Sequence, residues 1–435
     1  MRLMILSLIW KAVKVMSRID ELIKEKCPDG VEYKKLEEVF VQFSGMTGVS
    51  NKWAETGNCR FIEYMNAYKN ITIDVSKLPY ATVKKLEQNI LKKGDILFTS
   101  ASEVPDECAL ASVIEDDIEQ GIFLDDHLFG LRIKDEYCKY ICPSYLKYAF
   151  RAPEFRTQIF KVVRGVTRFY ISKTDFMTLE IPVPPIEAQQ EIVCILDKFI
   201  ELEAELQAEL DVRKKQYDEY LNLLMDFSND DSIKYMAVGE LFEIKNGLNK
   251  EKDAFGKGKP IINFTDVFKK RYLINGNFTG LVDVDEEEIE RYSAKKGDVF
   301  FTRTSETRED VGMSSTLIED VEGCVFSGFV LRARPRTNLL LPKFCSYYFS
   351  TNQVRRTIMR YASFTTRATT TGPKLSKIMV PILSICEQQK IVDILDRMET
   401  ICNDYEKGLP AEIEARHKQY EYYRDKLLTF ERKVV

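Results

Sequence analysis

The sequence predicts an α+β fold: two tandem mixed α/β domains, separated by two long antiparallel coiled-coil helices and related by a pseudo-two-fold axis. The first observation is that three segments return in the same order about 200 residues later. They are 92–99 and 295–302, 181–193 and 380–392, and 215–217 and 418–420. The second is that each copy ends in a long stretch rich in Glu, Leu, Lys and Gln. A tandem duplication of one mixed domain plus one long helix accounts for both.

The composition is that of an ordinary folded protein. The chain has 435 residues, of which 45% are hydrophobic and 30% are charged. This is long enough for two or more domains with proper cores. Ten cysteines are present without a Cys-x-x-Cys pair, and there are only two histidines. We therefore predict no metal site, reduced thiols and a cytoplasmic protein.

Residues 1–16 form an N-terminal extension. Its apolar run, 3–10, is too short to span a bilayer, which needs about 20 apolar residues. No small-residue cleavage site follows, so we interpret the segment as an extension rather than an export signal. We expect no other segment to be transmembrane.

The first mixed domain is predicted at residues 17–185. Short strand-like runs occur at 59–64, 96–99 and 128–133, and helical patterns occur at 143–150 and 153–163. Pro182, Pro184 and Pro185 cannot lie inside a helix or a central strand, so they mark the end of this domain.

A long helix is predicted at 186–227, where proline and glycine are absent. At 1.5 Å per residue it would be about 60 Å long. Its apolar residues follow a 3-4 spacing with one slip, which is typical of a coiled-coil seam with a stutter: Ile192, Ile195, Phe199, Leu202, Leu206, Leu210, Tyr217, Tyr220 and Leu224.

The second copy is predicted at 228–383, followed by a helix at 384–435. The segment 408–410, Gly-Leu-Pro, interrupts this helix, so we expect a kink or a short break there. Two equivalent helices that each need a partner seam most simply pack on each other. The second exit carries Leu383 and Ser384 where the first has a double proline.

Four motifs carry a resemblance to a known family: 27–36 (Cys-Pro-Asp-Gly-Val-Glu-Tyr-Lys-Lys-Leu), the paired Lys-Lys-Gly-Asp turns, the proline-rich exits followed by Gln-Gln and Ile-Val, and 416–424. In this order, across 16–430, the chain resembles the specificity subunit of a type I restriction–modification system. The resemblance implies that 17–185 and 228–383 are DNA target-recognition domains. It also implies that the helices at 186–227 and 384–435 bind methyltransferase subunits.

Motifs for catalysis are absent from the sequence. It has no Gly-x-x-x-x-Gly-Lys-Ser/Thr phosphate loop and no Asn/Asp-Pro-Pro-Tyr/Phe loop for a flipped adenine. The acidic residues form no recognisable metal-nuclease cluster. We predict a non-catalytic subunit without a cofactor, in a complex that methylates adenine and cleaves DNA. Two alternatives stay open: a self-contained DNA methyltransferase with unrecognised motifs, and a structural coiled-coil adaptor.

Basic residues concentrate before each long helix. The chain as a whole has 63 basic and 68 acidic residues, which argues against autonomous DNA binding. The segment 151–185, however, has six basic and three acidic residues, and 352–383 has six basic residues and no acidic one. A charged run is often only a solvated helix face. Its recurrence in both copies favours DNA contact.

The predicted DNA-binding residues lie in hydroxyl-rich loops and after the Lys-Lys-Gly-Asp turns. Arginine, threonine and lysine can reach phosphates and base edges. The set is Arg164, Thr167, Arg168, Lys173, Arg303, Arg308, Arg367, Thr369, Thr370 and Lys374. We interpret His127 as a core or turn residue, and Tyr217, Tyr220, Tyr420 and Tyr423 as packing residues.

The loops of the two copies differ in sequence, so two similar domains should read different half-sites of double-stranded DNA. We expect a bipartite, asymmetric target with unread base pairs between its halves. The predicted partners are this DNA, two methyltransferase subunits and restriction/translocase subunits. Exposed apolar surface should make the isolated chain poorly soluble or self-associating.

Overall fold

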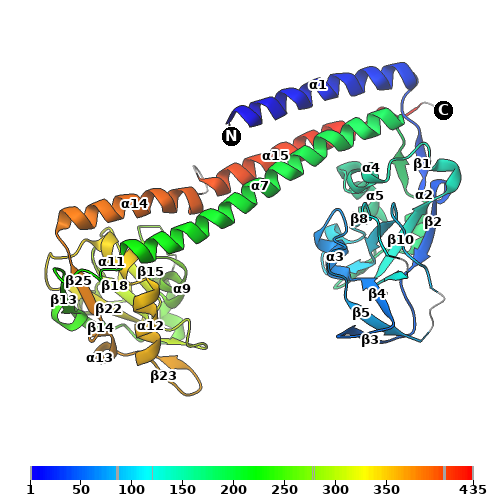
Figure 1. Cartoon of the computed structure of the whole chain (residues 1–435). Coiled ribbons are helices and arrows are strands. Elements are labelled where there is room, and N and C mark those ends of the chain that lie inside the picture. Colours follow the sequence, from blue (N-terminus) through cyan, green and yellow to red (C-terminus); the bar gives the residue numbers. More distant parts are fainter. Residues whose placement is uncertain are drawn as a thin grey trace. The chain divides into compact units, whose positions relative to one another are not determined.

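The computed structural model describes residues 2–84, 88–119, 121–276, 278, 280–404 and 408–433. The chain divides into two compact units (Figure 1). Unit 1 contains Met1–Leu206 and Ile413–Val435, and unit 2 contains Gln207–Glu412. Helix α7 (Ile186–Leu224) contributes its first half to unit 1 and its second half to unit 2, and each unit is described by itself.

Unit 1 is built on two four-stranded sheets, with the strand orders β2-β10-β6-β8 and β3-β5-β4-β9. Its elements before α7 are α1 (Arg2–Lys26), β1 (Tyr33–Lys35), α2 (Leu36–Val39), β2 (Phe40–Ser44), β3 (Val49–Ala54), β4 (Cys59–Ile62), α3 (Tyr64–Lys69), β5 (Tyr80–Val83), β6 (Ile96–Thr99), β7 (Ala101–Ser102), β8 (Ala111–Val113), β9 (Ile122–Leu124), β10 (Leu128–Ile133), α4 (Pro143–Ala149), α5 (Pro153–Val162), β11 (Phe169–Tyr170), α6 (Lys173–Met177) and β12 (Glu180–Pro182).

Unit 2 is built on a five-stranded sheet with the order β14-β22-β18-β20-β16. Its elements after α7 are β13 (Lys234–Ala237), α8 (Val238–Leu241), β14 (Phe242–Asn246), β15 (Phe255–Ile262), α9 (Phe264–Lys269), β16 (Tyr272–Leu273), β17 (Leu281–Val282), α10 (Glu286–Tyr292), β18 (Val299–Thr302), β19 (Thr304–Ser305), β20 (Ser314–Leu317), β21 (Val325–Phe326), β22 (Val330–Pro335), α11 (Pro342–Tyr348), α12 (Asn352–Tyr361), β23 (Ser363–Phe364), β24 (Ala368–Thr369), α13 (Gly372–Leu375), β25 (Met379–Ile382) and α14 (Ile385–Asn403).

The predicted break in the second long helix is confirmed. Helix α14 ends at Asn403, and α15 (Leu409–Leu427) begins beside Pro410. Proline is tolerated in the first turn of a helix because the N–H groups there have no partner within the helix. Residues 413–427 of α15 belong to unit 1.

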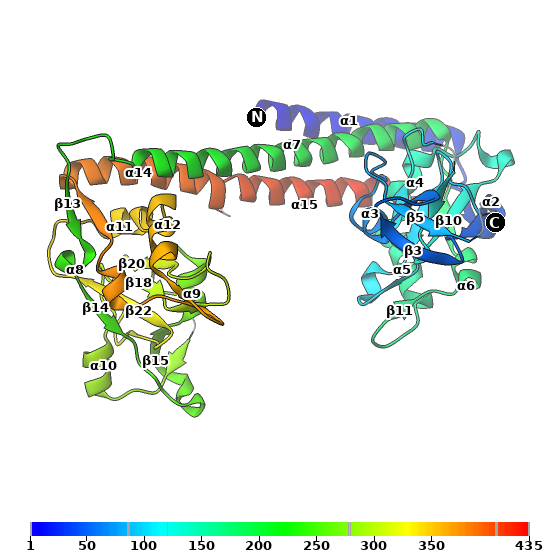
Figure 2. The ribbon, with the colours of Figure 1, turned by 60° about the horizontal axis from the view of Figure 1, so that its bottom comes forward.

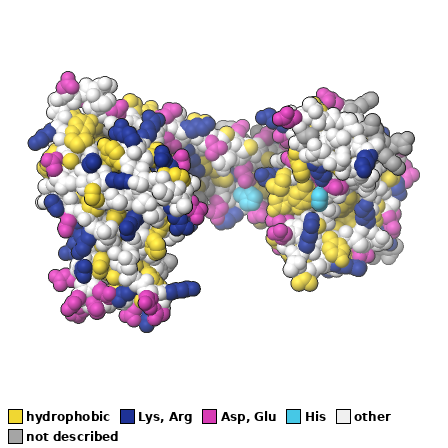
Figure 3. Space-filling model, turned by 90° about the horizontal axis from the view of Figure 1, so that it is seen from below, with side chains coloured by type: hydrophobic (Ala, Val, Ile, Leu, Met, Phe, Trp, Pro, Cys, Tyr) yellow, Lys and Arg dark blue, Asp and Glu magenta, His cyan; other side chains and the backbone are white. Residues whose placement is uncertain are grey.

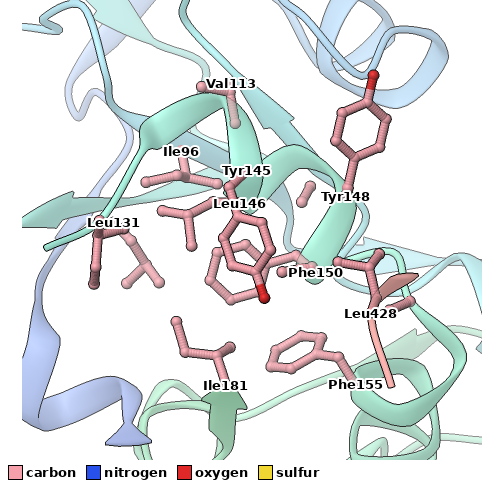
Figure 4. Packing of buried hydrophobic residues seen from close by; sticks show 14 of the residues in the cluster. Ile96, Val113, Leu131, Tyr145, Leu146, Tyr148, Phe150, Phe155, Ile181 and Leu428 are labelled. Atoms are coloured by element: carbon pink, nitrogen blue, oxygen red, sulfur yellow. The ribbon is translucent and has the colours of Figure 1, made fainter. Parts of the chain in front are cut away.

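The core of unit 1 forms where α4 packs on the first sheet. Figure 4 shows Tyr145, Leu146 and Phe150 among side chains from β6, β8 and β10, with Phe155, Ile181 and Leu428 beside them. Leu428 follows α15 and is 1% exposed. The C-terminal segment is therefore part of the core of the first domain.

The Lys-Lys-Gly-Asp turn has the same structure in both units. Gly94 and Gly297 adopt φ angles of +87° and +91°, which L side chains rarely adopt. The buried carboxylate of Asp95 accepts the Lys92 N–H at 2.8 Å and two guanidinium bonds from Arg132, both 2.7 Å. Asp298 accepts equivalent bonds from the Lys295 N–H and, at 2.9 and 2.7 Å, from Arg334. The motif thus anchors strands β6 and β18 to β10 and β22.

A buried glutamine joins each mixed domain to its long helix. In unit 2, Gln388 accepts the Leu341 N–H at 2.8 Å and donates to the carbonyls of Leu339 and Leu383. Gln189 makes the same three kinds of bond in unit 1, to Cys142, Tyr140 and Pro184. Both glutamines are 0% exposed. Each fixes the first turn of a helix to the loop before α4 or α11.

Replacing Gln388 by leucine should therefore destabilise unit 2 by about 1–3 kcal/mol, because a buried N–H and two carbonyls lose their partner. Gln389→Leu is the matched control, since Gln389 is exposed and, among the described residues, its side chain bonds only Asp393. Its effect should stay within about 0.5 kcal/mol. Urea unfolding, monitored by hydrogen exchange of the α14 backbone amides, measures the effects of both substitutions. Equal effects would show that the Gln388 bonds contribute nothing.

The long helices pack in antiparallel pairs within each unit. In unit 1 the ring of Phe199 on α7 stacks on Tyr423 of α15 with centroids 5.2 Å apart, and His417 lies 3.3 Å from Glu203. In unit 2 Arg271 lies over the Tyr217 ring of α7 and pairs with Glu399 of α14 at 3.1 Å. Tyr217, Tyr420 and Tyr423 are buried, which confirms their interpretation as packing residues. Tyr220 is 48% exposed, so the interpretation as a packing residue is wrong for Tyr220.

Helix α1 runs unbroken from Arg2 to Lys26, across the predicted end of the extension at residue 16. Figures 1 and 2 both show it beside the first half of α7. In the part of the chain that the structure describes, we find no helix with the length and apolar content that crossing a membrane requires. All ten cysteines are free thiols, and burial raises the pKa of Cys345 to about 12.

Candidate nucleic-acid interface

In unit 2 a small sheet brings together residues that are about 65 positions apart. Strand β19 pairs with β24, so that Thr304 lies opposite Thr369 and Ser305 opposite Ala368. The Thr370 N–H donates to the Arg303 carbonyl at 3.0 Å, and the Arg303 N–H donates to the Phe329 carbonyl at 3.0 Å. Arg303 and the threonine run thus lie side by side at the end of β18.

The hairpin β23–β24 carries further predicted residues. Arg367 is exposed at its turn, where the Thr365 N–H donates to the Arg367 carbonyl. The guanidinium of Arg308 lies 5.6 Å from the ring centroid of Phe364, which is 46% exposed. Lys374 donates from Nζ to the Ser363 hydroxyl. We call the predicted residues Arg303, Arg308, Arg367, Thr369 and Lys374 cluster 2.

The structure places Thr370 away from the surface. Its side chain is 0% exposed, so only its backbone takes part, through the bond to Arg303. In this conformation the hydroxyl is not accessible to a ligand.

In unit 1 a second cluster forms at the equivalent place. Strand β7 pairs with β11, with Ser102 opposite Phe169, and Arg164 pairs with Tyr170. A side chain at Gly165 (φ +122°) would lie 2.1 Å from the Arg168 carbonyl oxygen, so the turn that carries Thr167 and Arg168 requires glycine. We call Arg164, Thr167, Arg168 and Lys173 cluster 1.

Two cations of cluster 1 already have partners. Arg164 pairs with Asp175 at 2.7 Å, and Lys173 donates to the Ser44 hydroxyl at 2.5 Å. Among the described residues no carboxylate pairs with Arg168, Arg303 or Arg367. Arg168 and Arg367 are exposed and Arg303 is partly exposed, so all three guanidiniums are available to an anionic ligand.

The sequence count overestimates the number of accessible cations. Arg156 donates to the carbonyls of Asp106, Cys108 and Ala109, and Arg355 donates to those of Glu309 and Gly312. Burial lowers the pKa of both guanidiniums. Arg156 thus holds the loop after β7 in place, and Arg355 holds the loop after β19.

Two large exposed side chains, Phe329 and His127, stand beside these clusters, and Phe329 is not among the residues singled out from the sequence. Phe329 is 67% exposed beside Arg303. His127 holds the same place in unit 1, where the Ser100 N–H donates to its carbonyl at 3.0 Å. The His127 ring is 55% exposed and 3.0 Å from Asp125, so it is a turn residue, as predicted. The recurrence of a large residue just before β10 and β22 is the signal that could have pointed to them.

The carboxylates beside His127 are already paired. Lys52 lies 3.0 Å from Asp125 and also contacts Asp126.

In Figure 3, basic side chains on unit 2 are interspersed with hydrophobic ones, and a hydrophobic patch is visible on unit 1. Guanidinium, hydroxyl and aromatic groups in this mixture can contact phosphates, base edges and base faces.

Comparison with known proteins identifies the family of the two domains. A family model, the type I restriction modification DNA specificity domain, matches residues 28–212 and 231–415. The EcoR124I/EcoR124II specificity subunit of Escherichia coli is 32% identical over 282 residues, which are 60% of this chain and 66% of the relative. A putative type I specificity subunit of Haemophilus influenzae is 30% identical over 61% of this chain and 68% of its own length.

Two solved structures show the fold. A chain from a type I R-M system has a TM-score of 0.67 at 15% identity and covers 92% of this chain and 97% of its own length. The HsdS subunit of Thermoanaerobacter tengcongensis has a TM-score of 0.51 at 16% identity, with 92% and 97% covered. The predicted fold class, two tandem mixed domains joined by long helices, is confirmed. With two copies of the domain in tandem, the chain belongs to the type I restriction–modification DNA specificity family.

Proposed function

We propose that this chain is the DNA sequence-specificity subunit of a type I restriction–modification complex and does not itself catalyse a reaction. Residues 17–185 and 228–383 are its target-recognition domains, and 186–227 and 384–435 are its helical spacers. The observation that carries the proposal is the recurrence of a cationic cluster at the same place in both family domains. The complex binds double-stranded DNA, so we place it in the cytoplasm.

Each cluster reads one half of a bipartite, asymmetric target. Arg303, Arg367 and Arg168 are the first candidates for base edges, because they have no intramolecular carboxylate and stand beside hydroxyl groups. Lys173, Lys374 and Arg164 are already oriented by Ser44, Ser363 and Asp175, and suit phosphates. The guanidinium of Arg308 lies over the ring of Phe364, so the role of Arg308 is to position that ring.

The long helices serve as docking surfaces for methyltransferase subunits. In unit 2, several apolar side chains of these helices are exposed, which is unusual for a helix pair that needs no partner. They are Val212, Tyr220 and Leu223 on α7 and Ile394 and Ile401 on α14. We propose two methyltransferase subunits per chain, with restriction/translocase subunits joining them.

Comparing the adenine methylome of the host with and without this gene tests the proposal. Loss of methylation at one bipartite motif is the expected result. Unchanged methylation at all motifs would contradict it. Binding of S-adenosylmethionine by the isolated chain would favour a self-contained methyltransferase. An assembled complex that prefers no DNA sequence would favour a structural adaptor.

Replacing Lys374 by alanine should weaken DNA binding equally for all sequences, because a lysine held by Ser363 suits a phosphate rather than a base. The slope of log K against log salt should fall by about 1. Salt titration of the assembled complex on specific and random DNA measures it. Lys377→Ala, at an exposed lysine of the same segment, is the control. A loss confined to the specific site would instead make Lys374 a base contact.

A further inference from the structure

The two units differ at one face of their helix pairs. Gln189 and Gln388 occupy the same place at the start of α7 and α14, so Ile195 corresponds to Ile394 and Leu202 to Ile401. In unit 2 the isoleucines are 46% and 47% exposed, whereas Ile195 is 1% and Leu202 9% exposed in unit 1. The apolar face that unit 2 leaves open is covered in unit 1.

Helix α1 is the element that covers this face at Ile195. Ile19 is 4% exposed and lies in the same cluster as Ile192, Ile195 and Phe199, with Val15, Met16, Leu22 and Ile23 packed against it. Arg18 pairs with Glu191 at 3.3 Å and Lys26 with Glu187 at 2.5 Å, so α1 runs antiparallel to α7. Figures 1 and 2 show this helix along α7.

The described side chains of α1, residues 14–26, attach it only weakly. Among its residues from 14 onward only Ile19 is buried, and the side chains of both ion pairs reach solvent. Exposed pairs of this kind contribute little to stability. A cavity of about 420 Å³ also lies between α1 and the end of α15, lined by Met16, Ile23, Leu427 and Phe430 among others. Close packing is therefore incomplete beneath the helix.

We propose that α1 is an internal cover that occupies, in unit 1, the position taken on unit 2 by an amphipathic helix of the methyltransferase subunit. This rests on the proposed function. The two docking faces are then unequal: a first methyltransferase binds the open face of unit 2, and a second binds unit 1 only after α1 has moved away.

The charges beside the two faces identify the occupant of unit 2. Glu187 and Glu191, which attract α1, correspond to Cys386 and Lys390. Lys390 would repel Arg18, so the α1 of a second copy does not suit unit 2. A partner helix that presents an acidic residue to Lys390 does.

Displacement of α1 should appear as unequal binding steps. If α1 is open in about one tenth of molecules, the second methyltransferase binds about tenfold more weakly than the first. Ile19→Asp should bring the two steps together by releasing the cover. Ser17→Asp adds the same charge at an exposed position of α1 and should leave the steps unequal. Native mass spectrometry during titration of the full chain with its methyltransferase subunit measures both.

Two further variants separate the possible failures. Ile394→Asp should abolish the tighter step and leave the weaker one. The double variant Arg18→Glu, Lys26→Glu should act like Ile19→Asp without altering the core, with hydrogen exchange of residues 14–26 reporting release of α1. The proposal that α1 is a cover would be wrong if the two methyltransferase binding steps were equal in the unaltered chain. It would also be wrong if release of α1 left the two steps unchanged. No binding of the methyltransferase to any variant would overturn the proposed function itself.

Discussion

Replacing Arg334 by methionine is expected to destabilise unit 2 by about 3–5 kcal/mol, because it leaves the buried carboxylate of Asp298 without its counter-charge. Asp298 is 0% exposed and accepts two guanidinium bonds, at 2.9 and 2.7 Å. The Lys295 N–H alone cannot replace them. Urea unfolding, with hydrogen exchange of β18 and β22 to localise the loss, measures the effect.

Two controls define what the result means. Arg213→Met removes an exposed pair with Glu209 on α7, and should cost less than about 0.5 kcal/mol. Adding Asp298→Asn to Arg334→Met removes the unpaired charge and should restore part of the stability. If the single and double variants were equally unstable, packing of the Arg334 side chain rather than its charge would be responsible. Arg132→Met should affect unit 1 similarly through Asp95.

Replacing Arg367 by alanine is expected to impair recognition of one half-site only, at a cost of about 1–3 kcal/mol in specific binding. Arg367 is exposed at the turn of the β23–β24 hairpin, and no described carboxylate neutralises it. Cluster 1 lies in the other unit and should read its own half unchanged. Competition binding by the assembled complex, with each half-site randomised in turn, measures the effect.

Arg291→Ala is the matched control for Arg367. Arg291 is an exposed arginine of the same unit, outside cluster 2, with its guanidinium over the Tyr292 ring. It should leave both half-sites unaffected. An equal loss on all DNA sequences after Arg367→Ala would make Arg367 a phosphate contact. No loss at all would show that the hairpin does not read DNA.

Several local elements were predictable because their signals are short-range. Strands β6 and β10 have the bounds predicted at 96–99 and 128–133, and α4 and α5 begin at the predicted Pro143 and Pro153. The predicted strand at 59–64 ends two residues earlier, at Ile62, because α3 begins at Tyr64. Proline and glycine limit the backbone regardless of what packs around it.

In the two clusters, the sequence indicated that basic residues gather, but it did not indicate which of their side chains are accessible. The basic count near each exit could not distinguish Arg355, which turns inward to the Gly312 carbonyl, from Arg367, which is exposed. Nor could it show that Thr370 is buried while Phe364 is not. Side-chain direction depends on strand register, and here the register is set by the pairing of β19 with β24 across about 65 residues.

The sequence by itself determined the duplication, the ends of many elements and the family, since these depend on residue order and local backbone preference. Only the tertiary structure decided which cations are accessible, which large side chains stand beside them, and that α1 covers Ile195 while Ile394 stays open. The physical reason is that burial belongs to the contact between segments distant in the chain. Two copies with similar sequences can therefore present different surfaces.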